Sequence, residues 1–189
     1  PHFEVPIQAG NDEVLENMKR GYTHGDYRKL IAQIRTEVSN CSIATDIIVG
    51  FPGETDEQFE DTYQLLADLK MDVAHLARYS PRNKTVSKRQ MKDDIPDKVK
   101  RERFHRLEDL QKTIASEINA RLLGEALPVL FENKVKGRWR GRTSTNKLVF
   151  VESDDDLRGK VLSARITWTG PWSMQAQLLN KPPSPVILD

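Results

Sequence analysis

Cysteine is nearly absent from this 189-residue sequence, in which Cys41 stands alone. One thiol can form neither a disulfide within the chain nor a cysteine-only metal site. The sequence therefore excludes a fold that is held together by its own disulfide framework. A lone thiol agrees with a reducing compartment, and we expect a cytoplasmic protein.

Long apolar runs and a one-sided charge balance are absent as well. No stretch approaches about 18 consecutive apolar residues and no signal-peptide pattern opens the chain, so we expect no membrane contact. Charged residues make up 30% of the chain but leave a net charge of only +1, which is typical of an ordinary globular protein. Any surface for nucleic acid must therefore come from local clustering of basic residues.

Strand and helix patterns alternate over the first part of the chain. Apolar segments typical of strands lie at residues 2–8, 41–51 and 72–80. Helices are expected between them, because Asn11 is a good N-cap, a helical spacing starts near Thr23, and Thr55 forms a capping-box pattern with Gln58. This order is typical of parallel βαβ units with right-handed crossovers.

Three parallel strands alone would leave an edge of the sheet unpaired. A complete (β/α)8 barrel needs about 200 residues or more, so the first part is either a small open sheet or a piece of a larger barrel. The start of the sequence within a strand favours the piece. An incomplete barrel exposes apolar surface, and we expect that the chain can dimerise in a crystal through the open edge.

The second part of the sequence has a different character. The polar residues 80–95 indicate a loop, Pro96 suits the first position of a long helix to about Leu123, and Gly124 suits its end. Five short alternating segments then follow as far as residue 179. Such segments, separated by turns, predict a small closed β-barrel.

The fourth of these segments alternates regularly. Leu162, Ala164, Ile166 and Trp168 have the spacing of side chains that share one face of a strand. The proline-rich stretch after them is expected to be a flexible tail. The domains that we predict are residues 1–123, residues 124–179, and a tail at residues 180–189.

One strand runs directly into a glycine-rich turn in the stretch TDIIVGFPGET. The turn is no P-loop, since no GK[ST] follows at the required spacing. It is either a tight βα turn and nothing more, or part of a ligand site. Ligands of parallel α/β sheets bind at the carboxyl ends of strands, where the loops after Gln8, Gly50 and Tyr79 would meet.

A basic segment lies in the predicted barrel. Residues 133–150 contain no acidic residue. Their basic side chains and central aromatic residue are Lys134, Lys136, Arg138, Trp139, Arg140, Arg142 and Lys147. On a hairpin the three arginines would share one face, where cations could meet phosphates while an exposed Trp139 stacks on a base. A solvated hairpin without a ligand is the alternative.

Four long motifs occur in order along residues 1–179, and they read PHFEVPIQAGNDEVLENMKRGYT, ATDIIVGFPGE, YSPR and GRTSTNK. Together they resemble the methylthiotransferases of the radical S-adenosylmethionine (SAM) superfamily, most of all those that act on tRNA. The resemblance implies an α/β fold in which part of a radical SAM (β/α) barrel with parallel strands precedes a small all-β TRAM barrel that binds RNA.

The resemblance also implies an activity and its cofactors. Such an enzyme adds a methylthio group to C2 of N6-isopentenyladenosine next to the anticodon, using SAM and two 4Fe–4S clusters, with the tRNA anticodon stem-loop as partner. Similar enzymes modify threonylcarbamoyladenosine or an aspartate of a ribosomal protein.

The CxxxCxxC motif and three further cysteines of the family are missing here. The chain therefore resembles the C-terminal part of such an enzyme, and we expect it to be inactive alone, with no catalytic or metal-binding residue. A non-catalytic RNA-binding module remains the competing interpretation. A small complete α/β enzyme would need a nucleophile–base or metal constellation, which the sequence does not show.

Three residues match positions that contact SAM in the family, and the resemblance therefore assigns them to the cofactor. Asp46 would accept hydrogen bonds from ribose hydroxyls, Gln8 would donate and accept, and Arg20 would bind the methionine carboxylate. The alternatives are that Gln8 caps a strand end, that Arg20 is a solvated residue at a helix end, and that Asp46 pairs with a neighbour within the sheet. His2 and His75 are interpreted as strand side chains and not as metal ligands.

Overall fold

A computed structural model describes residues 1–81 and 86–179. The chain divides into two compact units, Pro1–Ala115 and Ser116–Asp189. The predicted tail at 180–189 lies outside the described residues. No described helix is both long and apolar enough to cross a membrane.

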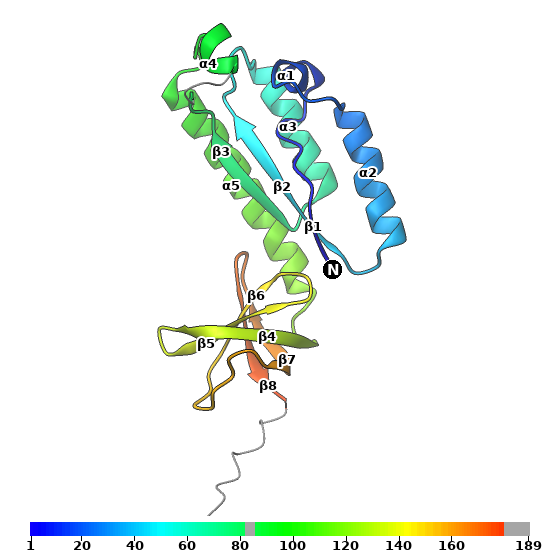
Figure 1. Cartoon of the computed structure of the whole chain (residues 1–189), viewed down its shortest axis with the longest axis vertical. Helices are drawn as coiled ribbons and strands as arrows, with labels where there is room; N and C mark the ends of the chain where they lie inside the picture. The colour runs from blue at the N-terminus through cyan, green and yellow to red at the C-terminus, as the bar shows by residue number, and fades with distance from the viewer. Residues whose placement is uncertain (82–85, 180–189) are drawn as a thin grey trace, which may run out of the picture. The chain divides into compact units, whose positions relative to one another are not determined.

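The first unit alternates strands and helices, as predicted (Figure 1). Its elements are β1 (His2–Glu4), α1 (Asp12–Asn17), α2 (His24–Glu37), β2 (Ser42–Val49), α3 (Asp56–Leu69), β3 (Val73–Arg78), α4 (Val86–Gln90) and α5 (Asp97–Ala120), whose last turn belongs to the second unit. The helices start where the sequence predicted. Asn11 accepts two backbone N–H groups at α1, and Thr23 and Thr55 form capping boxes with Asp26 and Gln58.

The three strands form a parallel sheet in the order β1-β2-β3. The first strand is shorter than predicted, because β1 ends at Glu4 and only a single bridge joins Gln8 to Ile47. Pro6 between them has no N–H to donate to a ladder, which explains the interruption. The short helix α4 replaces part of the predicted loop, since five residues are too few to show a helical period.

The two faces of the sheet differ. Thr45, Ile47 and Val49 of β2 are buried on one face, whereas Asp46 and Ile48 on the other face are only half-buried. The helices α2, α3 and α5 run alongside the strands (Figure 1). The Tyr27 hydroxyl of α2 lies 3.0 Å from Thr45 Oγ1 on the buried face, so this face belongs to the core. The opposite face, with Asp46 and Ile48, borders a cavity.

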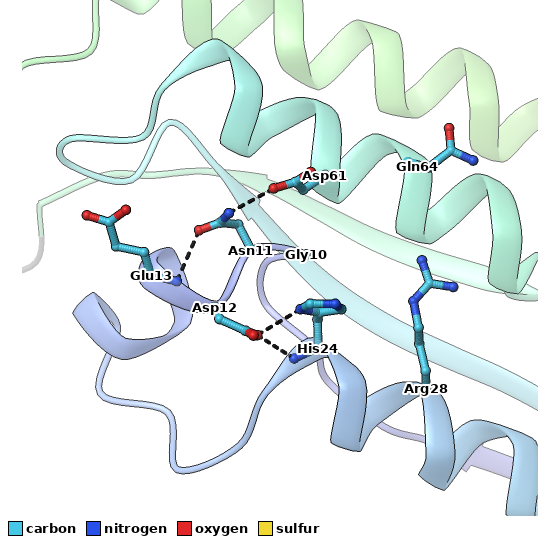
Figure 2. A pocket seen from close by; sticks show the side chains of 8 residues that line it. All are labelled: Gly10, Asn11, Asp12, Glu13, His24, Arg28, Asp61 and Gln64. Atoms are coloured by element: carbon cyan, nitrogen blue, oxygen red, sulfur yellow. Dashed lines mark hydrogen bonds and ion pairs between the residues drawn. The ribbon is translucent and has the colours of Figure 1, made fainter.

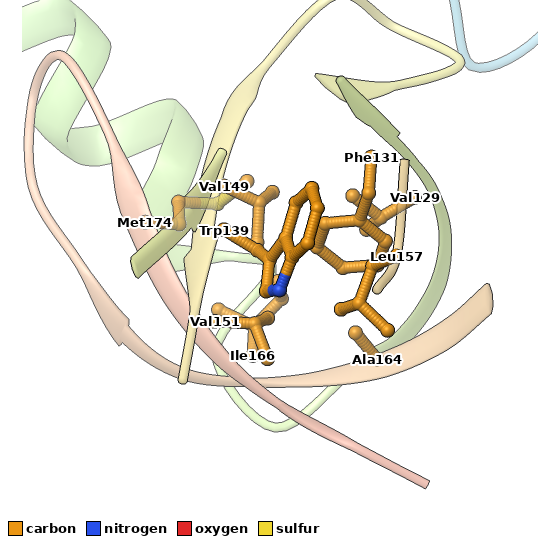
Figure 3. Packing of buried hydrophobic residues seen from close by; sticks show 9 residues of the cluster. All are labelled: Val129, Phe131, Trp139, Val149, Val151, Leu157, Ala164, Ile166 and Met174. Carbon is orange, nitrogen blue, oxygen red and sulfur yellow. The ribbon is translucent and has the colours of Figure 1, made fainter. Parts of the chain in front are cut away.

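Five strands of the second unit close into a barrel, which confirms the predicted closed barrel. They are β4 (Ala126–Val135), β5 (Arg138–Thr143), β6 (Leu148–Val151), β7 (Val161–Thr169) and β8 (Met174–Leu178). Their order around the barrel is β4-β5-β6-β8-β7, and every pairing is antiparallel except β6 with β8. Figure 3 shows the buried core, in which Trp139 lies among aliphatic side chains and Phe131.

The predicted face of the fourth barrel strand is wrong at one residue. Ala164 and Ile166 are buried as expected, but Trp168 is 49% exposed. The register between β7 and β8 shifts between Ile166 and Trp168. A β-bulge inserts one residue into a strand and turns the following side chains to the opposite face, which explains why alternation fails there.

Gly141 of β5 provides a test of barrel packing. A Cβ at this position would lie 2.6 Å from the Leu130 carbonyl oxygen and 2.7 Å from Val129 Cγ1. We expect Gly141→Ala to lower the free energy of unfolding of the barrel by about 1–3 kcal/mol, because overpacking forces the strands apart. Tryptophan fluorescence during urea unfolding measures this, because all three tryptophans of the chain lie in the second unit. Gly21→Ala, where a Cβ meets nothing within 4 Å, is the control, and equal stability of both variants would contradict the prediction.

Candidate functional site

A cavity of about 860 Å³ lies at the carboxyl ends of β2 and β3 in the first unit. Gln8, Arg20 and Asp46, the three residues assigned to a cofactor from the sequence, all line it. The structure thus brings together side chains that are far apart along the chain. It also places the loops after Gln8, Gly50 and Tyr79 at one edge, where parallel sheets bind ligands.

Gln8 is held in a strained backbone conformation beside the cavity. Its φ is 76°, a left-handed value that residues other than glycine rarely adopt, and the residue is 7% exposed. Two backbone hydrogen bonds fix it, from Gln8 N to Asp46 O (2.8 Å) and from Ile48 N to Gln8 O (2.9 Å). Such strain costs about 1–3 kcal/mol and persists where the surroundings enforce it, often at ligand sites.

Asp46 lies on the open face of β2, directly opposite His75 of β3 in the parallel register. Both side chains line the cavity. His75 Nε2 also lies 3.8 Å from Glu4 Oε2. His75 is a strand side chain, as predicted, but its place opposite Asp46 depends on the register and could not be read from the sequence.

Arg20 is in the turn after α1 and is exposed at the cavity. Its backbone N–H donates to Leu15 O at 2.9 Å, which closes the chain back onto the helix. The guanidinium can form paired hydrogen bonds with a carboxylate, a geometry that lysine cannot provide.

Two aromatic rings that the sequence analysis did not assign line the same cavity. Phe51 and Tyr79 meet edge to face, with ring centroids 5.2 Å apart. Each follows the last residues of a strand, β2 or β3. The signal that could have found Phe51 is its place between Gly50 and Pro52, immediately after a buried strand.

The GFPGE turn is closed by a buried carboxylate. Glu54 Oε2 accepts hydrogen bonds from the Gly50 backbone N–H at 2.7 Å and from Arg103 Nη1 at 2.6 Å. The side chains of Glu54 and Arg103 are 1% and 6% exposed. Burial raises the pKa of Glu54 above its ordinary value, although the Gly50 N–H and the Arg103 guanidinium oppose this shift.

A second residue of α5 supports the same turn. Gly50 has a φ of 72°, and a Cβ there would lie 2.4 Å from Lys100 Cγ, so the lysine stem occupies the space that a side chain would need. Lys100 Nζ lies 5.3 Å from the Tyr79 ring centroid and forms an ion pair with Asp93. The turn is therefore fixed in place by α5, and it holds Phe51 at the cavity.

A smaller cavity of about 270 Å³ lies beside α1 (Figure 2). Its lining residues are Gly10, Asn11, Asp12, Glu13, His24, Arg28, Asp61 and Gln64. Its polar groups largely bind one another, since His24 Nδ1 lies 2.9 Å from Asp12 and Asn11 Nδ2 donates to Asp61 at 2.8 Å. Within the described part of the chain, no group of three or more His, Cys, Asp or Glu side chains is arranged to hold a metal ion.

In the second unit, the three arginines of the basic segment share one face of β5, as predicted. Arg138, Arg140 and Arg142 alternate with residues that are buried in the barrel. The arginines are not purely cationic surface, because Glu132 of β4 lies 3.4 Å from Arg140 Nη2 and 3.6 Å from Arg142 Nε. Glu132 lies just outside the acid-free stretch that the sequence analysis delimited.

The predicted stacking role of Trp139 is wrong. Trp139 is 4% exposed and lies in the barrel core (Figure 3). Its Nε1 donates to Asp155 O at 2.9 Å. The ring cannot stack on a base, because the same alternation that turns the arginines outward turns Trp139 inward. Its polar atom is satisfied by the backbone, as buried tryptophans require.

The lysines of the segment lie away from the middle of β5. Lys134 is an exposed residue of β4, and its Nζ lies 5.3 Å from the Trp139 ring centroid. Lys136 lies in the turn before β5, and Lys147 lies in the turn after it. Lys136 and Lys147 add positive charge at the two ends of β5, whereas Lys134 pairs with the inward-facing Trp139 and not with an arginine.

A comparison with protein families matches residues 1–66 to the Radical SAM superfamily. This match covers about a third of the chain, and a radical SAM domain implies SAM and a 4Fe–4S cluster as cofactors. The matched residues contain Gln8, Arg20 and Asp46 together with the GFPGE turn, and thus every cavity-lining residue that precedes β3.

Curated relatives carry a more specific name. A tRNA-2-methylthio-N(6)-dimethylallyladenosine synthase of Dehalococcoides mccartyi (strain CBDB1) is 46% identical over 178 residues, which are 94% of this chain and 43% of the relative. The protein of that name from Chloroflexus aurantiacus is 47% identical over 178 residues, 93% of this chain and 38% of the relative. The chain thus spans about two fifths of the length of the relatives that it matches.

A solved radical SAM enzyme, coproporphyrinogen III oxidase (HemN) from Escherichia coli, shares the fold. The TM-score is 0.52 at 16% sequence identity, over 88% of this chain and 40% of that chain. This likeness agrees with the parallel sheet and its flanking helices.

The raised pKa of Glu54 leads to a stability test. The folded chain binds this proton more tightly than the unfolded chain, so stability from this group is present at low pH and is lost as pH rises from about 4.5 through the folded-state pKa. Glu54→Gln removes this titration. On acidification from about pH 7 to about pH 5, we expect the wild type to gain stability relative to Glu54→Gln in urea unfolding followed by circular dichroism.

Glu57→Gln, which neutralises an exposed carboxylate in the first turn of α3, is the matched control. A wild type that loses stability relative to Glu54→Gln on acidification would show that the Arg103 ion pair outweighs burial and would contradict this assignment.

Proposed function

We propose that this chain is part of a radical SAM tRNA methylthiotransferase that adds a methylthio group to C2 of N6-isopentenyladenosine next to the anticodon. The first unit contributes part of the SAM pocket, and the second unit binds the tRNA anticodon stem-loop. The names of the curated relatives support the substrate, and they favour it over threonylcarbamoyladenosine or a ribosomal protein aspartate. With tRNA as substrate, we place the reaction in the cytoplasm.

The observation that carries this proposal is the convergence of Gln8, Arg20 and Asp46 on one cavity beside Phe51 and Tyr79. The chemistry of these groups fits SAM. A carboxylate suits ribose hydroxyls, a guanidinium suits the methionine carboxylate, and apolar and aromatic side chains suit the adenine. The cavity volume of about 860 Å³ is in the range of small-molecule sites.

The iron–sulfur clusters do not fit the residues of this chain. Cluster binding needs several thiolates, and Cys41 is the one cysteine of the sequence. In the superfamily the cluster supplies the electron that cleaves SAM, so its ligands must lie outside these 189 residues. We therefore assign positioning and binding to this chain, and no catalytic residue.

The barrel supports an RNA-binding role. Small five-stranded barrels of the OB type bind oligonucleotides on strand faces, and this barrel presents Arg138, Arg140 and Arg142 on one such face. We propose that it is a TRAM domain. In this account Lys134, Lys136 and Lys147 add phosphate contacts around the arginines, whereas Trp139 acts only through the core.

A cofactor titration tests the first unit. We expect the 189-residue chain to bind S-adenosylhomocysteine, and Asp46→Ala to weaken binding about tenfold or more, because hydrogen bonds to a charged group contribute about 1.5–3 kcal/mol. Isothermal titration calorimetry measures the affinity. Asp61→Ala, which removes a carboxylate at the smaller cavity, is the matched control and should bind like the wild type. Equal binding by both variants would contradict the assignment of the cavity.

An RNA titration tests the second unit. Arg138→Ala, Arg140→Ala and Arg142→Ala together should weaken binding of a labelled anticodon stem-loop and flatten its salt dependence, because fewer counterions are released. Glu132→Gln should strengthen binding, since it frees Arg140 and Arg142 from a competing carboxylate. Fluorescence anisotropy at two salt concentrations measures both, with Glu57→Gln, an exposed carboxylate of α3 in the first unit, as control. Unchanged affinity in the triple variant would contradict an arginine-based site.

A non-catalytic RNA-binding module is the second candidate, favoured by the single cysteine. The two candidates differ in the first unit. A module would bind RNA without binding S-adenosylhomocysteine, whereas part of a methylthiotransferase should bind both.

A further inference from the structure

A large aromatic side chain is turned out of the barrel. Trp168 would point inward if the alternation of Ala164 and Ile166 continued, but the register shift after Ile166 places it outside with 49% of its surface exposed. Thr167 lies at this irregularity, and its Oγ1 is 3.3 Å from the Gln175 carbonyl oxygen. Bulges of this kind often re-aim a side chain toward a functional surface.

The strand register places Trp168 at one end of a row across the outer surface. Trp168 pairs with Gln175 of β8, Gln175 pairs with Phe150 of β6, and Phe150 pairs with Arg140 of β5. Adjacent strands lie about 4.8 Å apart, so this row crosses four strands over about 14 Å. We call Arg140, Phe150, Gln175 and Trp168 the outer row.

All members of the outer row face away from the core. Phe150 is half-buried between the buried Val149 and Val151, and it is not part of the core cluster. Gln175 is exposed beside the buried Met174. The guanidinium of Arg138 lies 5.5 Å from the Phe150 ring centroid, so a second arginine joins the basic end of the row.

The aromatic end of the row is held in a defined shape. A Cβ on Gly170 would lie 2.4 Å from Trp168 Cη2, so the indole lies directly against this glycine. Asn119 Nδ2 donates to Gly170 O at 2.8 Å and to Pro171 O at 3.2 Å, which fixes the hairpin between β7 and β8. A preorganised ring loses little conformational entropy when a ligand stacks on it.

We propose that the outer row is a base-stacking strip for single-stranded RNA, in which Phe150 and Trp168 stack on bases, Arg138 and Arg140 bind the phosphates between or beside them, and Gln175 hydrogen-bonds a base edge. The proposal rests on the proposed RNA-binding function and deepens it. It replaces the buried Trp139 by two outward rings as the aromatic part of the site. Aromatic rings interleaved with cations are the combination that single-stranded nucleic acid requires.

Charge selects RNA over a protein as the occupant. The row contains one cation, two aromatic rings and an amide, and it contains no carboxylate. Arg138 adds a second cation beside Phe150, and Glu132 of β4 contacts the guanidinium of Arg140. Trp172, which is 54% exposed, lies in the hairpin turn and outside the paired row.

The test separates stacking from phosphate binding. The 189-residue wild type, Trp168→Ala and Phe150→Ala are titrated into a fluorescein-labelled single-stranded RNA and into the same backbone with abasic sites, at several salt concentrations. We expect each variant to bind the RNA about 5- to 100-fold more weakly with an unchanged salt slope, and to bind the abasic strand like the wild type. Trp168→Phe should recover most of the affinity.

Matched variants make the outcome specific. Val161→Ala removes a 62% exposed apolar side chain from the same strand outside the outer row and should have no effect. Arg140→Ala should reduce the salt slope for both strands. Circular dichroism confirms that each variant is folded.

The possible failures are distinguishable. If the wild type binds no RNA at low salt, the proposed RNA-binding function fails. The surface then binds a protein or has no ligand. If the wild type binds and Arg140→Ala weakens binding, while Trp168→Ala and Phe150→Ala do not, RNA binding stands and the stacking strip is overturned. A loss of affinity that is equal for the abasic strand would also overturn it.

Discussion

The buried ion pair between Arg103 and Glu54 is the interaction on which the cavity of the first unit depends. Arg103 Nη1 lies 2.6 Å from Glu54 Oε2, and the same carboxylate oxygen accepts a hydrogen bond from the Gly50 N–H. Breaking a buried pair by removing one partner leaves an uncompensated charge, which typically costs about 3–5 kcal/mol. Helix α5 therefore fixes the position of the GFPGE turn, and the turn places Phe51 at the cavity.

Each unit contains a local departure from regular backbone geometry. In the first unit a strained Gln8 with a φ of 76° is held beside the cavity by backbone hydrogen bonds to β2. In the second unit a β-bulge exposes Trp168, whereas regular alternation of side chains would bury it. Each departure costs stability locally, and each brings a side chain to a surface where a ligand can reach it.

The sequence predicted what local rules control. The caps at Asn11 and Thr55, the helix start near Thr23 and the five barrel strands follow from hydrogen bonding and side-chain alternation, and the structure confirms them. Contacts that depend on strand register could not be predicted from the sequence. The position of His75 opposite Asp46, the closure of the turn by Arg103 and the exchange of an inward Trp139 for an outward Trp168 all require three-dimensional pairing.

A crystal structure of the chain with S-adenosylhomocysteine tests the central claim most directly, namely that the cavity at the carboxyl ends of β2 and β3 is part of a SAM pocket. The account predicts the ribose hydroxyls within hydrogen-bonding distance of Asp46, the carboxylate near Arg20, and the adenine beside Phe51 and Tyr79. Ligand bound elsewhere, or an adenosine moiety that leaves Asp46 without contact, would contradict it.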